Sequence, residues 1–249
     1  MKKWFIAVAS LAILHTSHAQ GLKGFMKKVS GDSSSKPSLG NILGGGNQGG
    51  LSASTIANGL KEALEVGTQR GAEKLSAADG FFKDAAIKIL MPEEAQKVEQ
   101  KLRSLGMGSQ VDNAILSMNR AAEDASKSAA PIFVNAIKQM SIQDAAGILK
   151  GGDFAATDYL KSKTTASLTE AFRPAIEAAL TKVDATKYWN TVFSTYNKFS
   201  LQKVNTDLVA YVTEKALVGL FHEVALQEQK IRKDPAAQTT ALLKQVFGK

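Results

Sequence analysis

The chain has no cysteine among its 249 residues. Disulfide bonds, thiolate metal sites, thiol nucleophiles and attachment as a lipoprotein through a cysteine are therefore excluded. An exported protein with this composition has to be held together by the packing of its side chains alone.

Histidine is almost as scarce, because only His222 lies beyond the first 19 residues. A Ser-His-acid triad or a zinc site of histidine and cysteine ligands needs more of these residues than the chain supplies. The apolar spacing around His222 places it on the outer side of its helix, so we interpret it as a surface residue rather than a ligand or general base. No metal and no cofactor is predicted, and carboxylates are the remaining candidates for chemistry.

Long basic runs are absent as well, although the formal net charge is +8. More than half of this excess lies at Lys2 and Lys3 and in residues 20–50, and the rest of the chain is nearly balanced in sign. A nucleic-acid binder concentrates positive charge on one face. We therefore expect no nucleic-acid partner.

Residues 1–19 are predicted to form a cleaved signal peptide. Lys2 and Lys3 precede the apolar run 4–14, and residues 17–19 place small side chains at the positions that a signal peptidase requires. This run is shorter than the roughly 20 residues that cross a bilayer, and no later run is long enough. We expect a periplasmic protein that is not a lipoprotein; an uncleaved N-terminal anchor is the alternative.

Residues 20–50 have the composition of a flexible linker, rich in glycine and serine. Inside it, residues 22–29 place four apolar side chains on one side of a short helix and three lysines on the other. This pattern is typical of weak peripheral membrane contact. The alternative, which we favour, is a stub that docks on the body or stays disordered.

Residues 51–249 predict an all-α fold, because apolar residues recur at helical spacing almost without interruption. We expect an irregular bundle of about nine or ten helices. Representative apolar stripes are Val111, Ile115, Met118 and Ala122; Ile142, Ala145 and Leu149; Leu168, Phe172, Ile176 and Leu180; and Val209, Val212, Ala216, Leu220, Val224 and Ile231.

Helix boundaries are predicted from proline, glycine and capping residues. Pro92 opens a helix, Gly106 and Gly108 end it, and Ser141 with Asp144 resembles a capping box. Further expected boundaries are the stop at Gly151-Gly152 and the caps Asp153 and Asp184.

Two segments depart from the helical pattern. Pro174 lies inside a continuous apolar stripe, so we expect a kink or a break there. Residues 87–91 alternate like a strand, but without a partner strand they are interpreted as an extended connector.

The densest polar cluster inside an apolar helix is Asn119-Arg120-Ala121-Ala122-Glu123-Asp124. Asn119 and Glu123 share one face, and Arg120 and Asp124 form a second pair four residues apart. In the functional interpretation Glu123 is an acid/base and Arg120 clamps an anionic substrate. In the structural interpretation, which we favour, these are ordinary intrahelical pairs plus one interhelical salt bridge.

Three other motifs are interpreted as structural. Asp153 and Asp158 do not have the spacing of a calcium loop, and the glycines 44–46 lack the Lys-Ser/Thr of a phosphate loop. An aromatic set at helical spacing is more typical of a core than of a ligand pocket. It consists of Tyr188, Trp189, Phe193, Tyr196 and Phe199.

Several segments together resemble the bacterial family DUF4197, a domain of unknown function. They are residues 117–123 (Ser-Met-Asn-Arg-Ala-Ala-Glu), 130–133, 136–141, 148–153, 215–221, 228–237 and 239–248. The resemblance covers about residues 51–248 and implies an exported helical protein. It brings no catalytic residues with it. The chain departs from the family pattern at residues 90–92 and in its long linker.

These observations favour a non-enzymatic exported binding or interaction module, whose partner is an envelope protein or an apolar ligand. One alternative is a carboxylate-based envelope enzyme that acts through Glu123 and Arg120, with Asn119 beside them. The other is a peripheral membrane protein attached through residues 22–29.

Overall fold

The computed structural model describes residues 52–182, 185–199, 207–238 and 240–247. Within these ranges the fold is all-α and contains no strand. The leader, the linker with residues 22–29, and Asp184 lie outside the described residues, as do the side chains of Tyr188, Tyr196 and Phe199. The helices are α1 (Ala53–Ser76), α2 (Gln96–Ser104), α3 (Gly108–Ser126), α4 (Ala129–Lys138), α5 (Ile142–Lys150), α6 (Ala155–Thr181), α7 (Ala185–Phe199), α8 (Leu208–Lys233) and α9 (Ala241–Phe247), with short 3₁₀ turns at Glu93–Ala95 and Pro235–Ala237.

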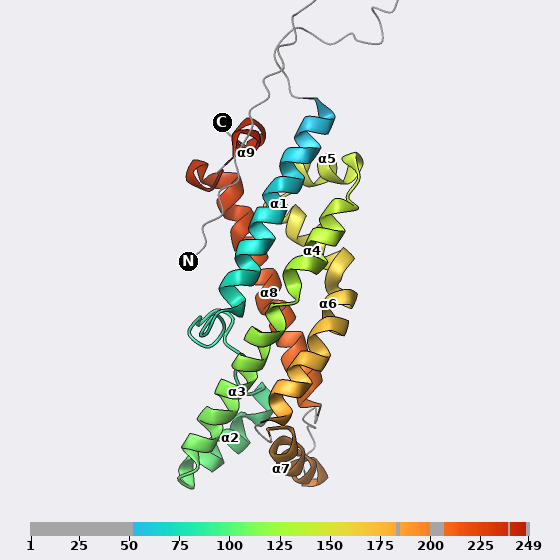
Figure 1. Cartoon of the computed structure of the whole chain (residues 1–249). Coiled ribbons are helices and arrows are strands. Elements are labelled where there is room, and N and C mark those ends of the chain that lie inside the picture. The colour runs from blue at the N-terminus through green and yellow to red at the C-terminus, as the bar shows by residue number, and fades with distance from the viewer. Residues whose placement is uncertain (1–51, 183–184, 200–206, 239, 248–249) are drawn as a thin grey trace, which may run out of the picture. The chain divides into compact units, whose positions relative to one another are not determined.

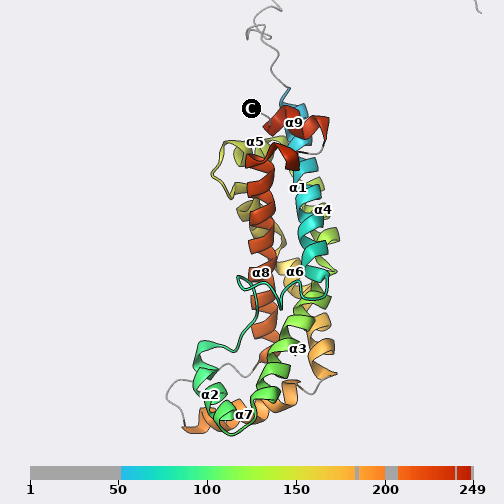
Figure 2. The same ribbon diagram turned by 90° about the vertical axis from the view of Figure 1, so that its left-hand side faces the viewer.

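The long helix α8 organises the bundle, because it packs against α1 on one side and α6 on another. Helix α6 in turn packs against α3 and α4. Figures 1 and 2 show α2 and α7 at one end of these long helices and α5 and α9 at the other. The stripe predicted for α8 is buried along its whole length, from Val209 to Ile231.

Helices α1 and α8 approach closely because α1 carries glycine at the contact. A Cβ atom added to Gly67 would lie 3.3 Å from Cδ1 of Ile231, and one added to Gly71 would lie 3.3 Å from Cγ of Glu223. Gly59 approaches α9 even more closely, since its Cβ would lie 2.5 Å from a methyl group of Val246. Small residues at four-residue intervals therefore set the distance between α1 and the C-terminal helices.

Helix α6 runs without interruption through Pro174, so the expected break is wrong. Its predicted stripe is fully buried: Leu168, Phe172, Ile176 and Leu180 all have 0% exposure. Side-chain packing on both sides of Pro174 holds the helix together even though proline lacks the N–H for one intrahelical hydrogen bond.

Two predicted helix boundaries are confirmed in detail. Gly106 has a φ of +80° and ends α2 in a Schellman motif, in which its N–H bonds to the carbonyl of Arg103 and the N–H of Met107 bonds to the carbonyl of Leu102. Gly108 begins α3 instead of ending α2. Ser141 and Asp144 form the predicted capping box at α5.

One predicted core residue is misplaced. Ile142 was assigned to an apolar stripe but is 53% exposed, whereas Ala145 and Ile148 face the core. In the first turn of a short helix the apolar spacing does not determine which face is buried.

Residues 77–92 form a non-helical connector between α1 and the turn that begins α2. It contains no strand, as the sequence predicted, and it passes alongside α3 and α8 (Figure 1). Phe81 and Ile89 anchor it in the core, with exposures of 0% and 2%. The connector carries the candidate functional site.

Candidate functional site

Asn119, the first of the three candidate residues, is completely buried and holds the connector at Ile89. Its Oδ1 accepts a hydrogen bond from the Ile89 N–H at 2.9 Å, and its Nδ2 donates to the Ile89 carbonyl at 2.8 Å and to the Ile115 carbonyl at 2.7 Å. A buried amide that satisfies both backbone groups of one residue replaces the partner strand that the connector lacks.

Glu123 holds the same connector one helical turn further along α3. It is 4% exposed, and its Oε1 accepts hydrogen bonds from the backbone N–H groups of Phe81 and Phe82 at 3.1 and 3.2 Å. Its other oxygen lies 2.6 Å from Nη1 of Arg120. A buried carboxylate is stable here because it is both paired and hydrogen-bonded.

Arg120 links this carboxylate to the connector turn. Its second guanidinium nitrogen lies 2.7 Å from Asp79, and Lys83 approaches the other oxygen of Asp79 at 2.8 Å. The hydrogen bond from Lys83, followed by the one from Arg120, lowers the pKa of Asp79. Glu123 and then Asp79 raise the pKa of Arg120.

The expected pairing of Arg120 with Asp124 is wrong. Asp124 pairs instead with Lys127, three residues later, at 2.7 Å. Arg120 pairs with Glu123 and with a carboxylate of the connector, so its second bridge is not interhelical. The sequence could not place Asp79 beside α3, because this contact depends on the path of the connector.

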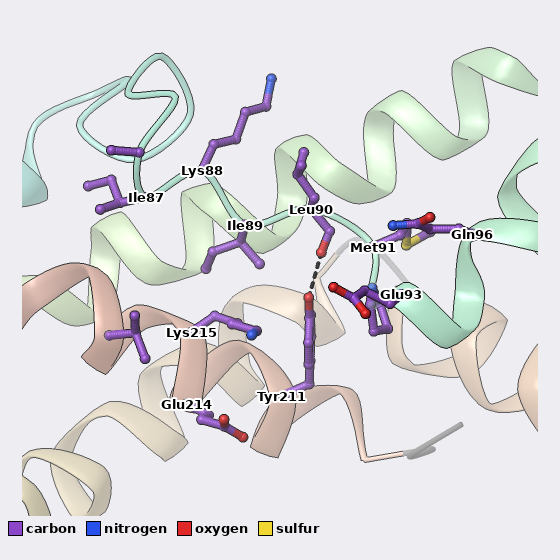
Figure 3. A pocket seen from close by; sticks show the side chains of 13 residues that line it. Ile87, Lys88, Ile89, Leu90, Met91, Glu93, Gln96, Tyr211, Glu214 and Lys215 are labelled. Carbon is purple, nitrogen blue, oxygen red and sulfur yellow. Dashed lines mark hydrogen bonds between the residues drawn. The ribbon is translucent and has the colours of Figure 1, made fainter. Parts of the chain in front are cut away.

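A pocket of about 620 Å³ lies on the other side of the connector, between residues 86–96 and the first half of α8 (Figure 3). Its apolar wall includes Leu90, Met91 and Val218, and its charged groups are Lys88, Glu93, Glu214 and Lys215. Asn119, Arg120 and Glu123 do not line it. Asn119 therefore holds a wall of the pocket from behind at Ile89, whereas Arg120 and Glu123 hold the start of the connector, which does not line the pocket.

The connector presents its side chains alternately to the core and to the pocket. Ile87 and Ile89 are buried, whereas Lys88 is partly exposed and Leu90 is 55% exposed. Val218 faces the same pocket from α8 with 60% exposure. Isolated apolar side chains are ordinary on a protein surface, but two that border one concavity indicate a binding site.

Tyr211 closes one side of the pocket and was not identified from the sequence. Its hydroxyl donates to the Leu90 carbonyl at 2.7 Å (Figure 3). Its ring stacks on that of Trp189 at 6.2 Å between centroids, and Nζ of Lys215 lies 5.7 Å from its centre. Its place inside an apolar helix stripe could have identified it, since a half-buried tyrosine usually finds a hydrogen-bond partner for its hydroxyl.

A second buried carboxylate holds the junction between α5 and α6. Glu228 of α8 is 6% exposed and accepts hydrogen bonds from the backbone N–H groups of Ala156 and Thr157, at 3.0 and 2.8 Å. It also pairs with Arg232 at 2.8 Å. The first turn of α6 is therefore capped from another helix. Asp153, the predicted cap, pairs instead with Lys233 at 2.9 Å.

The described residues offer no further site at the histidine, among possible metal ligands or in a membrane-spanning helix. His222 is exposed, as predicted. No cluster of three or more histidine, cysteine or acidic side chains that could hold a metal ion occurs in the described ranges. Among the helices that the structure describes, none combines the length and apolar character of a membrane span.

A smaller pocket of about 460 Å³ lies between α4 and α6, around Tyr159. Burial, and then the carboxylate of Asp144, raises the pKa of this tyrosine. The side chain of Asp144 is already engaged in the capping box with Ser141, whose hydroxyl and then backbone lower its pKa. We therefore take the connector pocket as the better candidate.

Comparison with known proteins gives one match. The family model described as "Protein of unknown function (DUF4197)" matches residues 50–248, which is nearly the whole chain beyond the linker. No curated protein and no solved structure matches the chain.

Proposed function

This chain belongs to the DUF4197 family, whose description names no activity, and we propose that it is a non-enzymatic interaction module. The proposal is based on the connector pocket. The connector pocket holds an apolar side chain of a partner protein. The proposal includes export through the predicted leader, so that the partner is a protein of the cell envelope.

The observation that carries this proposal is the pair of exposed apolar side chains, Leu90 and Val218, on opposite walls of one pocket. The frame around them is firm, because Asn119 and Glu123 fix the connector and Tyr211 fixes the Leu90 carbonyl. A preorganised pocket loses little conformational entropy when it binds. Charged groups of both signs at its rim favour a protein segment over a purely apolar molecule.

The carboxylate-enzyme alternative has less support. Both oxygens of Glu123 already accept hydrogen bonds, and neither this residue nor Arg120 lines the pocket. A general base has to reach the proton that it removes. No observation in the described residues favours a reaction at this carboxylate.

Membrane contact through residues 22–29, the cleaved leader and the count of nine or ten helices depend on segments outside the described residues. They stay predictions. The binding role proposed for the pocket does not require any of them except the leader.

Site-specific photo-crosslinking tests the proposal. A benzophenone amino acid placed at Val218, and separately at Leu90, in the full chain within living cells is expected to crosslink the same envelope protein, identified by mass spectrometry. The matched control is Lys230, exposed on the same helix about 18 Å further along its axis.

The adduct at Val218 should disappear when Leu90→Asp is added, because a carboxylate in the pocket opposes burial of an apolar side chain. If positions 218 and 90 give no adduct beyond that seen at Lys230, or give unrelated ones, the pocket is not a protein-binding site.

A further inference from the structure

The connector has a free main-chain edge beside Ile89. Both backbone groups of Ile89 point to Asn119 on α3, and the alternating burial of residues 88–90, which follow a turn, indicates an extended chain. In an extended chain the carbonyl before a residue and the N–H after it point away from that residue's own groups. The Lys88 carbonyl and the Leu90 N–H therefore point away from α3.

This edge faces the pocket. The Leu90 carbonyl, which points to the same side as the Leu90 N–H, accepts from Tyr211 on the pocket wall (Figure 3). Among the described residues, the Leu90 N–H and the Lys88 carbonyl have no hydrogen-bond partner. Leu90 is 55% exposed, so an arriving chain can reach its amide.

The free groups allow one paired position opposite Ile89. In a parallel pair, one residue of the incoming strand donates to the carbonyl before the opposing residue and accepts from the N–H after it. In an antiparallel pair of the non-hydrogen-bonded kind, the two residues that flank the one opposite Ile89 use the same two groups. A longer ladder in either direction would need the Lys88 N–H and the Leu90 carbonyl, which already bond to Asp84 and Tyr211.

We propose that the connector pocket binds its partner as an extended segment that pairs with the main chain along residues 88–90 as a short added strand. This inference rests on the proposed function and names the chemistry of the partner. Main-chain pairing supplies the affinity, and the apolar wall around Leu90 and Val218 selects the side chains that alternate along the segment.

The charges around the pocket predict the order of residues in the segment. Figure 3 shows Lys88 and Lys215 toward the Ile87 end, whereas Glu93 lies toward the Gln96 end. Glu214, close to Lys215, leaves the first end with a positive excess. The segment therefore places an acidic residue at the first end and a basic residue at the second, so a parallel segment begins with the acidic residue and an antiparallel segment begins with the basic one.

The test uses two fluorescein-labelled peptides that share a Val-Thr-Val core. In the first, glutamate precedes the core and lysine follows it; in the second, these two residues are exchanged. Fluorescence anisotropy with the full chain should show that one peptide binds more tightly by about threefold to tenfold, as expected for exposed charge pairs. Tighter binding of the first peptide indicates a parallel segment, and tighter binding of the second indicates an antiparallel one.

Leu90→Pro is the decisive variant, because it removes the N–H that the fold leaves unused together with the leucine side chain. Leu90→Ala is the matched control, since it trims the side chain and keeps the amide. Affinity of Leu90→Pro for the tighter-binding peptide should be about tenfold below that of Leu90→Ala, the value of one hydrogen bond. As a second measurement, the Leu90 amide of the unmodified chain should exchange its hydrogen more slowly when that peptide is bound.

Each outcome decides the matter. Equal binding to Leu90→Pro and to Leu90→Ala, with no slowing of exchange at Leu90, overturns strand addition; if Val218→Glu still abolishes peptide binding, the pocket keeps its proposed function. Equal binding of the two peptides overturns the orientation of the segment by the charges around the pocket. Absence of binding by both peptides also overturns the inference, and the crosslinking at Val218 then decides separately whether the pocket binds protein.

Discussion

The connector and the α5–α6 junction are held by the same arrangement, a buried glutamate with an arginine beside it. In each, a buried glutamate on a long helix accepts two consecutive backbone N–H groups and pairs with an arginine on its own helix. Glu123 binds Phe81 and Phe82 with Arg120 beside it, and Glu228 binds Ala156 and Thr157 with Arg232 beside it.

The two regions differ in what surrounds the glutamate and its arginine. The side chain of Arg232 is 16% exposed and also donates to the Ile148 carbonyl, so the junction is closed. The side chain of Arg120 is 42% exposed and reaches Asp79 at the start of the connector, whose later residues line the 620 Å³ pocket. A buried carboxylate with an adjacent arginine is therefore no sign of catalysis in this protein. What distinguishes the connector is the exposed edge behind it.

The largest expected effect is at the closed junction. Glu228→Ala should lower the free energy of unfolding by about 3–5 kcal/mol, because Arg232 and the first turn of α6 lose a buried partner. Glu123→Ala should cost less, about 2–4 kcal/mol, since Arg120 can turn to solvent. Urea unfolding of both variants measures the difference. A greater loss of unfolding free energy for Glu123→Ala would contradict the view that the α5–α6 junction is the more closed of the two regions.

Asn119→Ala is expected to lower the free energy of unfolding by about 2–4 kcal/mol, because the buried N–H and carbonyl of Ile89 lose their partner. Asn113→Ala on the exposed side of the same helix is the matched control and should stay within about 0.5 kcal/mol of the unmodified chain. Both are measured by urea unfolding. Equal effects would mean that the connector does not depend on the amide.

Gly219→Ala tests the packing between the connector and α8. The new Cβ would lie 2.5 Å from Cε1 of Phe81, whose ring is fully buried and cannot move away. We expect a loss of about 1–3 kcal/mol in the thermal or urea unfolding free energy. Gly147→Ala in α5, where nothing lies within 4 Å, should instead stabilise by about 0.5–1 kcal/mol. A stabilising Gly219→Ala would show that Phe81 is loosely held.

The smallest effect concerns Asp79, whose pKa is lowered below 3.8 in the folded chain by Lys83 and Arg120. A lowered folded-state pKa contributes stability that is complete above the unfolded value and is lost as the pH falls through the folded value. Asp79→Asn should therefore be less stable than the unmodified chain near neutral pH, and the difference should vanish in strong acid. Asparagine tolerates the φ of +70° at this position, so the backbone is retained.

Urea unfolding of both chains from neutral pH down to strong acid measures this. A difference between the two chains that stays constant with pH would exclude the carboxylate of Asp79 as its cause.

Much of the fold could be predicted from apolar spacing and capping residues. The stripes of α3, α6 and α8, the capping box at Ser141 and a connector without a strand at residues 87–91 are confirmed. The errors, which are the break at Pro174, the cap at Asp153 and the burial of Ile142, share one cause. At each position a tertiary contact or the packing of neighbouring helices overrode a correct local preference.

The candidate site was predicted only in part. The cluster at residues 119–123 was found because polar residues inside an apolar stripe are conspicuous. Its expected partners were wrong, since Asn119 and Glu123 bond to the backbone of the connector. Tyr211 and Asp79 were missed. Each of them contacts a residue more than forty positions away in the sequence, and no local spacing encodes such a pairing.

The sequence by itself determined that the body is helical, that it contains no thiol chemistry, and to which family it belongs, because these depend on composition, periodicity and linear motifs. Only the tertiary structure decided that Asn119, Arg120 and Glu123 grip a connector and that a pocket opens on its far side. The physical reason is that a buried polar group is defined by its partner, and each partner here comes from a distant part of the chain.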